Sequence, residues 1–466
     1  MNIFGKKRNN KVNFKEIKIN LNPFEAFARL SKKFDDIYIL ESIFGPEKLS
    51  EFSYIGFNPS LMITLDNNII KVVSKNNENN IDITNSNDLF SNLREILKEN
   101  KIDNNFNRLI GGLVGFISYD IIRNWEEISD NYTKVTYSDF QFGLFNEGII
   151  FDHEKGKTYY YYSEQDKSEE IIELLNAEWK ESEIGTIKYT EPSSNINKKV
   201  FENNVEIAKE YIKSGDIFQV VLSRKYEFEI TGDLLAIYMS LRTINPSPYM
   251  YYYKNKNVNI IGSSPEMLVR VTNNQIETFP IAGTRPRDKD SEKNKQLTEE
   301  LLSDEKERAE HVMLVDLARN DVGQISKFGT VKVSEFMQVH QFSHVQHIVS
   351  KVVGELRTDR DCFDAIRAIF PAGTVSGAPK IRAMEIIQEL ENESRGPYAG
   401  ALGYFSKNLC ADFAITIRTL VVKGKDAYIQ AGAGIVADSI PEKEWFETEQ
   451  KASALIAALK MSKGGN

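Results

Sequence analysis

Apolar residues form a clear helical pattern near the middle of the chain. They recur at helical spacing at the positions Phe201, Val205, Ala208, Tyr211 and Ile212. This spacing predicts an amphipathic helix, and Gly215 follows where a C-terminal cap belongs. The next segment, IFQVVLSRKYEFEI (217–230), is rich in β-branched and aromatic residues. It predicts a strand, and helical and strand patterns alternate from there to the end of the chain.

The first third of the chain has a different pattern, dominated by short apolar runs. The runs YIGFNPSLMITL (54–65) and LIGGLVGFISYDII (109–122) are typical of strands. Between them lies an Asn-rich stretch, residues 76–88, which predicts a loop because asparagine favours turns and no apolar face repeats. The glycines of GGLVGFISYD (111–120) indicate close backbone packing of a strand, since no GKS or GKT follows to make a phosphate loop.

These patterns divide the chain into four parts. Residues 1–11 form a polar tail, and residues 12–165 form a strand-rich N-terminal region. A connection follows over residues 166–199, and residues 200–460 form a large second region. No internal repeat occurs at periods of 20 to 50 residues. The expected fold class is therefore α/β or α+β.

Composition and charge narrow the class of protein. The chain has 466 residues, 41% of them hydrophobic, enough for one large core or two ordinary ones. The formal net charge of -9 argues against broad nucleic-acid or anionic-membrane binding. The two cysteines, Cys362 and Cys410, form no CxxC motif, which argues against zinc and against a disulfide framework. No signal peptide or 18-residue apolar run is found, so we expect a cytoplasmic protein.

Segments that contain more small residues than core packing requires are concentrated in the second region. Six of them stand out: GSSPEMLVR (262–270), PIAGTRPR (280–287), ERAEHVMLVDLARNDVG (307–323), FPAGTVSGAPK (370–380), GPYAGALGYF (396–405) and QAGAGIV (430–436). Gly-rich turns present backbone N–H groups, which hold carboxylates as they hold phosphates. One such turn alone is usually structural, but their density predicts a site for an anionic substrate.

Two pairs of carboxylates also occur at helical spacing. Glu307 and Glu310 lie three residues apart in one predicted helix, and Glu444 and Glu447 lie three apart in a later one. Carboxylates without cysteine or histidine suit a hard cation such as Mg²⁺. On spacing alone, two solvated helix faces would explain the same pattern.

Taken together, these segments closely resemble the chorismate-utilising enzymes. The resemblance runs from about residue 200 to 458, and the N-terminal region resembles that of the family members that form anthranilate. It implies a sandwich of two packed β-sheets with helices outside and an active site in the cleft between them. It also implies a lyase that acts on chorismate.

The resemblance assigns the metal ligands and the acid. Glu310 and Glu447 match the family's Mg²⁺ ligands, and the metal holds the ring carboxylate of chorismate. Glu307 would then orient a metal-bound water. Glu266, in SSPEM, matches the general acid that protonates the departing C4 hydroxyl, a role that burial of the carboxyl would favour.

The resemblance also assigns contacts to the substrate. Arg418 and Tyr398 match residues that grip the enolpyruvyl carboxylate, for which the planar fork of arginine is suited. Thr374 is expected to face the ring, and His347 matches a histidine that assists pyruvate elimination. Further backbone or side-chain contacts fall on Gly283, Thr284, Gly432, Ala433 and Gly434.

Two positions distinguish the reactions within the family. Members that add water at C2 carry a lysine base where this chain has Gln219, and glutamine cannot act as a base. Members that form aminodeoxychorismate carry a nucleophilic lysine where this chain has Ala282. Both positions favour direct addition of ammonia at C2 to give anthranilate and pyruvate, the first step of tryptophan biosynthesis.

The resemblance further implies feedback inhibition by L-tryptophan. The predicted inhibitor contacts are Ser42, Pro248, Tyr249 and Met250, which come from both regions, so we do not expect the N-terminal region to fold alone. A turn with a core aromatic residue would also explain SPY (247–249). No glutaminase signature is present, so we expect a separate glutamine amidotransferase subunit to supply the ammonia.

Three alternatives stay open. The chain could form aminodeoxychorismate, form salicylate, or serve as a silent homologue that binds tryptophan or chorismate as a regulatory module. Ala282 argues against the first and Gln219 against the second. Retention of the acid, the metal ligands and Arg418 argues against the third.

Overall fold

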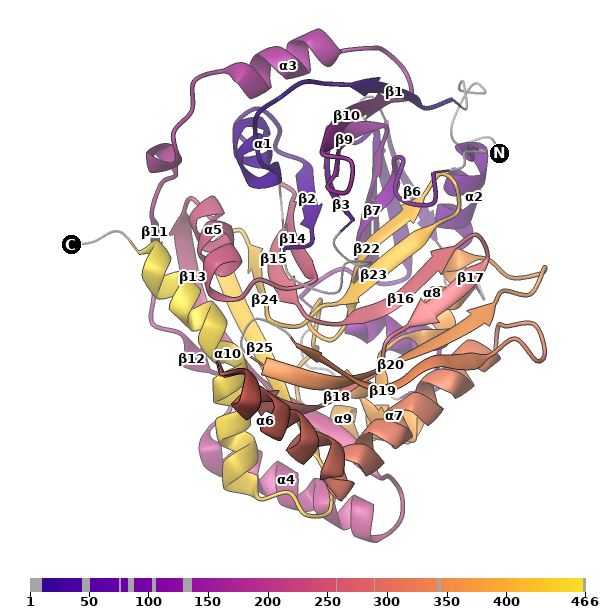
Figure 1. The fold of residues 1–466 in the computed structure, drawn as a ribbon, viewed down its shortest axis with the longest axis vertical. Helices are drawn as coiled ribbons and strands as arrows, with labels where there is room; N and C mark the ends of the chain where they lie inside the picture. Colours follow the sequence, from indigo (N-terminus) through magenta and orange to yellow (C-terminus); the bar gives the residue numbers. More distant parts are fainter. Residues whose placement is uncertain are drawn as a thin grey trace.

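The computed structural model describes residues 11–43, 51–74, 77–82, 88–102, 106–128, 136–256, 258–288, 290–341 and 345–463. Their backbone forms two large sheets with helices around them (Figure 1). Neighbouring strands in both sheets are antiparallel, which makes the fold α+β and confirms the expected class.

The first sheet contains 13 strands among the described residues. In spatial order they are β1 (Asn13–Glu16), β10 (Lys157–Tyr162), β9 (Glu147–Asp152), β3 (Phe52–Phe57), β2 (Ile37–Glu41), β14 (Tyr249–Lys254), β15 (Val258–Ser264), β24 (Thr419–Lys423), β25 (Asp426–Ile435), β13 (Gln219–Gly232) and β11 (Ile187–Tyr189). The short strands β12 (Ser193–Ser194) and β21 (Gly377–Ala378) also pair with β13.

The second sheet contains 12 strands among the described residues. In order they are β18 (Ile281–Pro286), β20 (Val345–Glu355), β17 (Gln275–Thr278), β16 (Met267–Thr272), β23 (Ala411–Ile415), β22 (Ala401–Ser406), β7 (Gly112–Ile117), β8 (Phe140–Phe145), β4 (Leu61–Asp66), β5 (Ile69–Ser74) and β6 (Glu78–Asp82). The long strand β19 (Lys332–Gln341) pairs with β20.

Helices cover the outer faces. They are α1 (Pro23–Leu30), α2 (Ser91–Glu99), α3 (Ser168–Asn176), α4 (Lys198–Lys213), α5 (Leu235–Ile244), α6 (Ser291–Ser303), α7 (Glu305–Gly323), α8 (Cys362–Ile369), α9 (Lys380–Leu390) and α10 (Pro441–Ser462), with short 3-10 turns η2 (Tyr119–Asn124), η3 (Glu181–Glu183) and η4 (Gly373–Val375). Helices α1, α3, α5 and α10 pack on the outer face of the first sheet, and α4 and α9 pack on β13 and β25.

The main hydrophobic core lies between the two sheets. Aromatic rings from opposite sheets meet there: Tyr38 of β2 packs edge-on against Phe145 of β8, with ring centroids 4.7 Å apart. Tyr54 of β3 meets Tyr404 of β22 in the same way at 6.0 Å. Such pairs contribute about 0.5–1.5 kcal/mol beyond the burial of their area. The sandwich implied by the family resemblance is therefore confirmed.

In each sheet the strands of the N-terminal region form one block, which joins the block from the second region at a single pair of strands. Strand β2 pairs with β14 in the first sheet, and β7 pairs with β22 in the second. Because each region completes the other's sheets, their strands cannot reach this pairing separately. The exact boundaries at residues 165 and 200 stay a prediction.

Several local expectations are confirmed and two are wrong. The predicted helix over 201–212 is α4, and Gly215 follows its end at φ +85°. The predicted strand over 217–230 is β13. Of the Asn-rich stretch, residues 76 and 83–87 lie outside the described residues, and residues 78–82 form strand β6 rather than loop, since they pair with β5; a backbone ladder at a sheet edge needs no apolar face. Likewise QAGAGI (430–435) and IAGTRP (281–286) are strands rather than turns.

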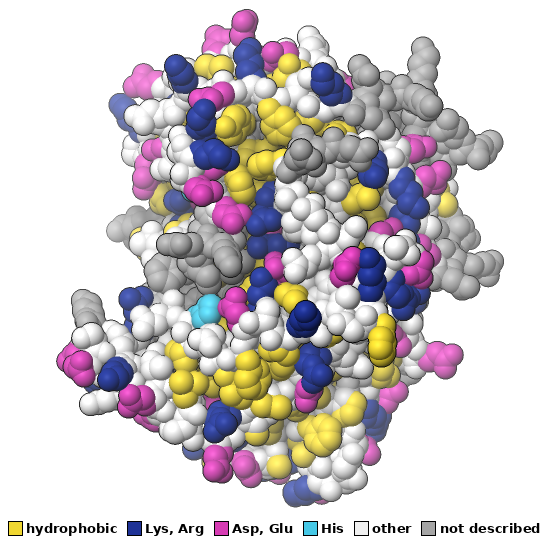
Figure 2. Space-filling view, turned by 45° about the vertical axis from the view of Figure 1, so that its right-hand side comes forward, with side chains coloured by type: hydrophobic (Ala, Val, Ile, Leu, Met, Phe, Trp, Pro, Cys, Tyr) yellow, Lys and Arg dark blue, Asp and Glu magenta, His cyan; other side chains and the backbone are white. Residues whose placement is uncertain are grey.

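The surface shows mixed charge on the face drawn in Figure 2, where Lys and Arg side chains are interspersed with Asp and Glu. Among the residues that the structure describes, no helix is both long and apolar enough to span a bilayer. The cytoplasmic location stays a prediction.

The close packing of β7 yields a first test. A Cβ at Gly115 would clash with the backbone carbonyl of Gln141 on β8, whereas a Cβ at Gly323, at the end of α7, would meet no atom within 4 Å. We expect Gly115→Ala to lower the free energy of unfolding by ~1–3 kcal/mol, because the neighbouring backbone must move. Gly323→Ala is the control. Equal urea midpoints for the two variants would contradict the close approach.

Candidate active site

Glu266 lies where the chain crosses from one sheet to the other. It follows β15 of the first sheet and directly precedes β16 of the second. The side chain is 8% exposed, and Thr374 of η4 donates a hydrogen bond to its Oε1 at 2.9 Å. Thr374, predicted to face the ring, therefore touches the predicted acid.

Burial raises the pKa of Glu266 to about 7, against the smaller opposing effects of Thr374, Lys451 and Arg418. An ordinary glutamate is fully ionised at neutral pH. Because this carboxyl is half protonated there, it can donate a proton to a leaving group. The burial expected for the acid is found.

Arg418 occupies a second crossing between the sheets. It lies between β23 of the second sheet and β24 of the first, with a left-handed backbone at φ +51°. Burial lowers the pKa of the Arg418 guanidinium, while the carboxyl of Glu266 acts in the opposite direction. The two crossings are joined, since Ile415 N donates to Glu266 O at 3.0 Å and Ser263 N donates to Arg418 O at 3.2 Å.

The predicted metal ligands come together from two helices. Burial raises the pKa of Glu310 on α7, and the nearby carboxylates of Glu307 and Glu447 raise it further. Glu447 lies on α10, 137 residues after Glu310 in the chain. Spacing within each helix cannot show that the two helices lie close together.

These carboxylates fit a hard divalent cation. Their donor atoms are all oxygen. Besides burial, the like charges of neighbouring carboxylates raise the pKa of Glu310, and a cation would neutralise these charges. Among the described residues, no group of three His, Cys, Asp or Glu side chains gathers to enclose a metal. Two carboxylates leave room for waters and a substrate carboxylate, an arrangement typical of Mg²⁺ sites. The Mg²⁺ assignment itself stays a prediction.

Gln219 sits against this cluster at the start of β13. Its Nε2 donates to Glu310 Oε1 at 3.2 Å, and a Cβ at Gly434 would lie 2.6 Å from that nitrogen. Gly434 therefore gives the amide its space. The Gln219 Oε1 atom is buried and accepts no hydrogen bond from the described residues.

His347 on β20 and the PIAGT segment (280–284) form a further part of the predicted site. The imidazole Nδ1 lies 2.8 Å from Gly283 O, to which it donates, and 3.1 Å from Thr284 Oγ1. Burial lowers the pKa of His347, and the charge of Arg418 lowers it further. The imidazole is thus neutral near pH 7, as a proton acceptor must be. Gly283 has a left-handed backbone at φ +67°. A Cβ added there would be crowded, because it would lie 3.2 Å from Glu307 Oε2.

The remaining predicted contacts lie on β25 and beside it. A Cβ at Gly432 would lie 2.7 Å from the Tyr398 hydroxyl, so glycine is needed for that close approach. Ala433 points the other way, because its methyl group belongs to the core under α4 and α9. Only its backbone can contact a substrate. The contacts of all these residues with chorismate stay predictions.

Lys451 is the site residue that sequence reasoning missed. It is paired with Glu447 at 2.8 Å, donates to Gly432 O at 2.9 Å, and lowers the pKa of both Glu266 and Glu310. The signal was its position four residues after Glu447 on the same helix face. Glu307 also has an unforeseen partner, Arg285, at 3.2 Å.

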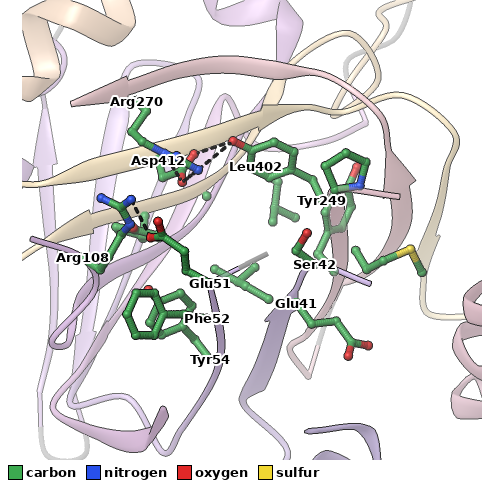
Figure 3. A pocket seen from close by; sticks show the side chains of 16 residues that line it. Glu41, Ser42, Glu51, Phe52, Tyr54, Arg108, Tyr249, Arg270, Leu402 and Asp412 are labelled. Carbon is green, nitrogen blue, oxygen red and sulfur yellow. Dashed lines mark hydrogen bonds and ion pairs between the residues drawn. The ribbon is translucent and has the colours of Figure 1, made fainter. Parts of the chain in front are cut away.

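The predicted inhibitor residues line a separate cavity between the sheets. All four, Ser42, Pro248, Tyr249 and Met250, border this space of about 560 Å³, which is partly open to solvent. Ser42 points into it, whereas the Glu41 carboxylate points away (Figure 3) and bonds Arg242 at 2.7 Å. Among the described residues, the buried hydroxyls of Ser42 and Tyr54 have no hydrogen-bond partner. These groups leave polar atoms available to a ligand.

Two ion pairs border the same cavity. Arg108 pairs with Glu51 at 2.8 Å, and Arg270 pairs with Asp412 at 2.8 Å, where the Tyr249 hydroxyl also donates (Figure 3). With aromatic rings alongside, the cavity offers both apolar surface and charge. This combination suits a zwitterion with a flat apolar side chain.

Comparisons with known proteins identify the family. Residues 35–457 match the sequence profile of the chorismate binding enzyme family. Anthranilate synthase component 1 of Methanothermobacter thermautotrophicus is 47% identical, over 100% of this chain and 98% of its own. The Aquifex aeolicus protein of the same name is 43% identical, over 94% and 92%.

Solved structures give the same picture. Anthranilate synthase component I of Streptococcus pneumoniae superposes with a TM-score of 0.78 at 38% identity, covering 87% of this chain and 92% of that one. The menaquinone-specific isochorismate synthase of Escherichia coli shares the fold, with a TM-score of 0.73 at 20% identity over 96% and 95%. The family resemblance is confirmed.

The raised pKa of Glu266 makes a prediction about stability. Its folded-state pKa of about 7 exceeds the ordinary value of ~4.3, so the carboxyl favours folding at low pH and loses that contribution as pH rises through 7. We expect Glu266→Gln to be stabilising, with a gain about 2 kcal/mol larger at pH 8.5 than at pH 5.5. Urea unfolding at both pH values measures it. Exposed Glu173→Gln on α3 is the control; an equal gain at both pH values would refute the raised pKa.

Proposed function

Since the chain belongs to the chorismate binding enzyme family, we propose that it is the large subunit of an anthranilate synthase. It converts chorismate and ammonia to anthranilate and pyruvate in the presence of Mg²⁺. The relatives that are 40–47% identical over nearly their full length support this member of the family over the others.

The buried carboxyl of Glu266 is the observation that carries the proposal. Its pKa of about 7 and its position beside Arg418 suit an acid that acts next to an anionic substrate. A silent binding module would gain nothing from a glutamate in a site that disfavours its charge. The chemistry proposed below therefore starts from this residue.

The two carboxylates of chorismate have complementary partners at opposite sides of the site. Arg418, with the Tyr398 hydroxyl on the same side, binds the enolpyruvyl carboxylate. Glu310 and Glu447 would hold Mg²⁺, which when bound supplies positive charge for the ring carboxylate. Lys451, paired with Glu447, adds a second positive charge at this side. These contacts fix the ring between the acid and the nucleophile.

The reaction then follows from the residues that face the ring. Ammonia adds at C2 through its lone pair while Glu266 gives its proton to the C4 hydroxyl, which leaves as water with its bonding electrons. The new ammonium group then gives up a proton. Loss of the C2 proton and cleavage of the C3–O bond restore the aromatic ring, and the released enolpyruvate takes up a proton to become pyruvate. His347, held neutral by burial and by Arg418, assists this elimination.

Gln219 and Ala282 explain why ammonia rather than another nucleophile adds. The amide of Gln219 has no basic nitrogen with which to deprotonate water. Ala282 is buried beside Ile348 on β20 and offers no amine for covalent attack. Ammonia needs neither a base at position 219 nor an amine at position 282, because its lone pair is already nucleophilic.

Regulation and supply of ammonia complete the proposal. L-tryptophan inhibits by binding in the cavity lined by Ser42, Pro248, Tyr249 and Met250. A separate glutamine amidotransferase subunit delivers ammonia in the cytoplasm. The free Cys362 and Cys410 are both buried, so neither of these two is placed to act as a glutaminase nucleophile.

Anthranilate fluorescence tests the proposal directly. With chorismate, Mg²⁺ and ammonium, we expect the purified chain to generate this fluorescence, to need the metal, and to be inhibited by tryptophan. Glu266→Gln should reduce turnover at least ~100-fold, because the proton donor is lost. Consumption of chorismate without anthranilate would favour aminodeoxychorismate formation, and no consumption would favour the regulatory homologue.

A lysine at position 282 tests the choice of nucleophile. We expect Ala282→Lys to reduce anthranilate formation and to give a chorismate-derived adduct on the new amine, detectable by mass spectrometry. Ala282→Met, of similar length but without an amine, is the control for crowding in this buried position. If both variants lose the same activity and neither carries an adduct, the argument from position 282 fails.

A further inference from the structure

Tyr251 borders the inhibitor cavity and also reaches toward the active site. It lies on β14, 2% exposed, and lines the cavity beside Tyr249. Its ring lies over Gly262 of β15, where a Cβ would clash with the ring carbons. The ring is thus held between the cavity on one side and the backbone that leads to Glu266.

The Tyr251 hydroxyl begins a buried chain of hydrogen bonds. It lies 2.6 Å from Thr419 Oγ1, and Thr419 Oγ1 donates to Ile417 O at 2.8 Å. A threonine hydroxyl has a single proton, which goes to Ile417 O, so Tyr251 must be the donor in the first bond. The chain therefore runs in one direction, from the cavity wall to the peptide that precedes Arg418.

Arg418 depends on this support because of its backbone. Its φ of +51° is sparsely populated for a residue with a Cβ, and such a conformation persists only when its surroundings hold it. The chain from Tyr251 fixes the carbonyl before Arg418, and Ser263 N fixes the carbonyl of Arg418 itself. Both supports come from the β14–β15 hairpin.

We propose that Tyr251 is a positioning residue that holds Arg418 in place for the substrate and transmits occupancy of the cavity to it. A ligand that displaces the ring of Tyr251 weakens the bond to Thr419, and the turn that carries Arg418 relaxes. Chorismate binding then weakens without any contact between the two ligands. This inference rests on the proposed function of both sites.

Thermodynamic linkage makes the proposal measurable in both directions. If tryptophan weakens chorismate binding by some factor, chorismate must weaken tryptophan binding by the same factor. A residue that carries the coupling changes this factor, whereas a residue that only lines the cavity changes the affinity for tryptophan alone. The two roles are therefore separable by titration.

Tyr251→Phe is the test, since it keeps the ring and removes only the hydroxyl. We expect the chorismate KM to rise roughly two- to tenfold with kcat nearly unchanged, as loss of one buried hydrogen bond predicts. We also expect tryptophan to bind still, by calorimetry, while its effect on chorismate affinity falls toward onefold. Tyr253→Phe is the matched control, because the Tyr253 hydroxyl on the same strand is buried and has no hydrogen-bond partner in the part of the chain that the structure describes.

Thr419→Val provides the second variant and guards against misfolding of the first. It removes the middle of the chain, so it should reproduce both effects, and the double variant should be no worse than either single one. Wild-type activity with tryptophan inhibition would establish the proposed function. If Tyr251→Phe then keeps the wild-type KM and coupling, or the double variant is additive, the inference on Tyr251 is wrong while the proposed function stands.

Discussion

The burial of opposite charges at the two crossings between the sheets is the constraint on which the site depends. Glu266 and Arg418 lie in chain segments that leave one sheet and enter the other, and backbone hydrogen bonds join these segments. Burial shifts both side chains toward their neutral forms. By contrast, the buried Arg395 is paired with Glu391 at 2.7 Å. The site thus retains electrostatic free energy that a charged ligand can release.

The sandwich is what makes this possible. Each crossing is short, so the residues on it are fixed by the strands on both sides rather than by their own loop. The same hairpin, β14–β15, borders the inhibitor cavity and supports both Glu266 and Arg418. Because the N-terminal strand β2 pairs with β14, the N-terminal region is part of this support. The proposed catalytic and inhibitor sites therefore share one set of backbone hydrogen bonds.

Local patterns predicted the elements better than their arrangement. Helix α4 and strand β13 followed from spacing and residue type, because a single face or a run of β-branched residues decides them. The glycines of β25 were misread as turns, since the close approach of Tyr398 and Gln219 is a long-range contact. The pairing of Glu310 with Glu447 and the role of Lys451 came only from the family resemblance or the structure, as spacing cannot relate helices that are far apart in sequence.

Counting charge around the substrate shows why a divalent cation belongs in the proposal. Arg285 is shared among Glu300, Asp304 and Glu307, and Lys451 is paired with Glu447, so these two cations are already engaged by carboxylates. Chorismate would add two further carboxylates. Burying this extra charge would oppose binding strongly in a partly desolvated cleft. A bound Mg²⁺ would offset it, and Glu310, whose pKa is raised by burial and by its like-charged neighbours, would gain most.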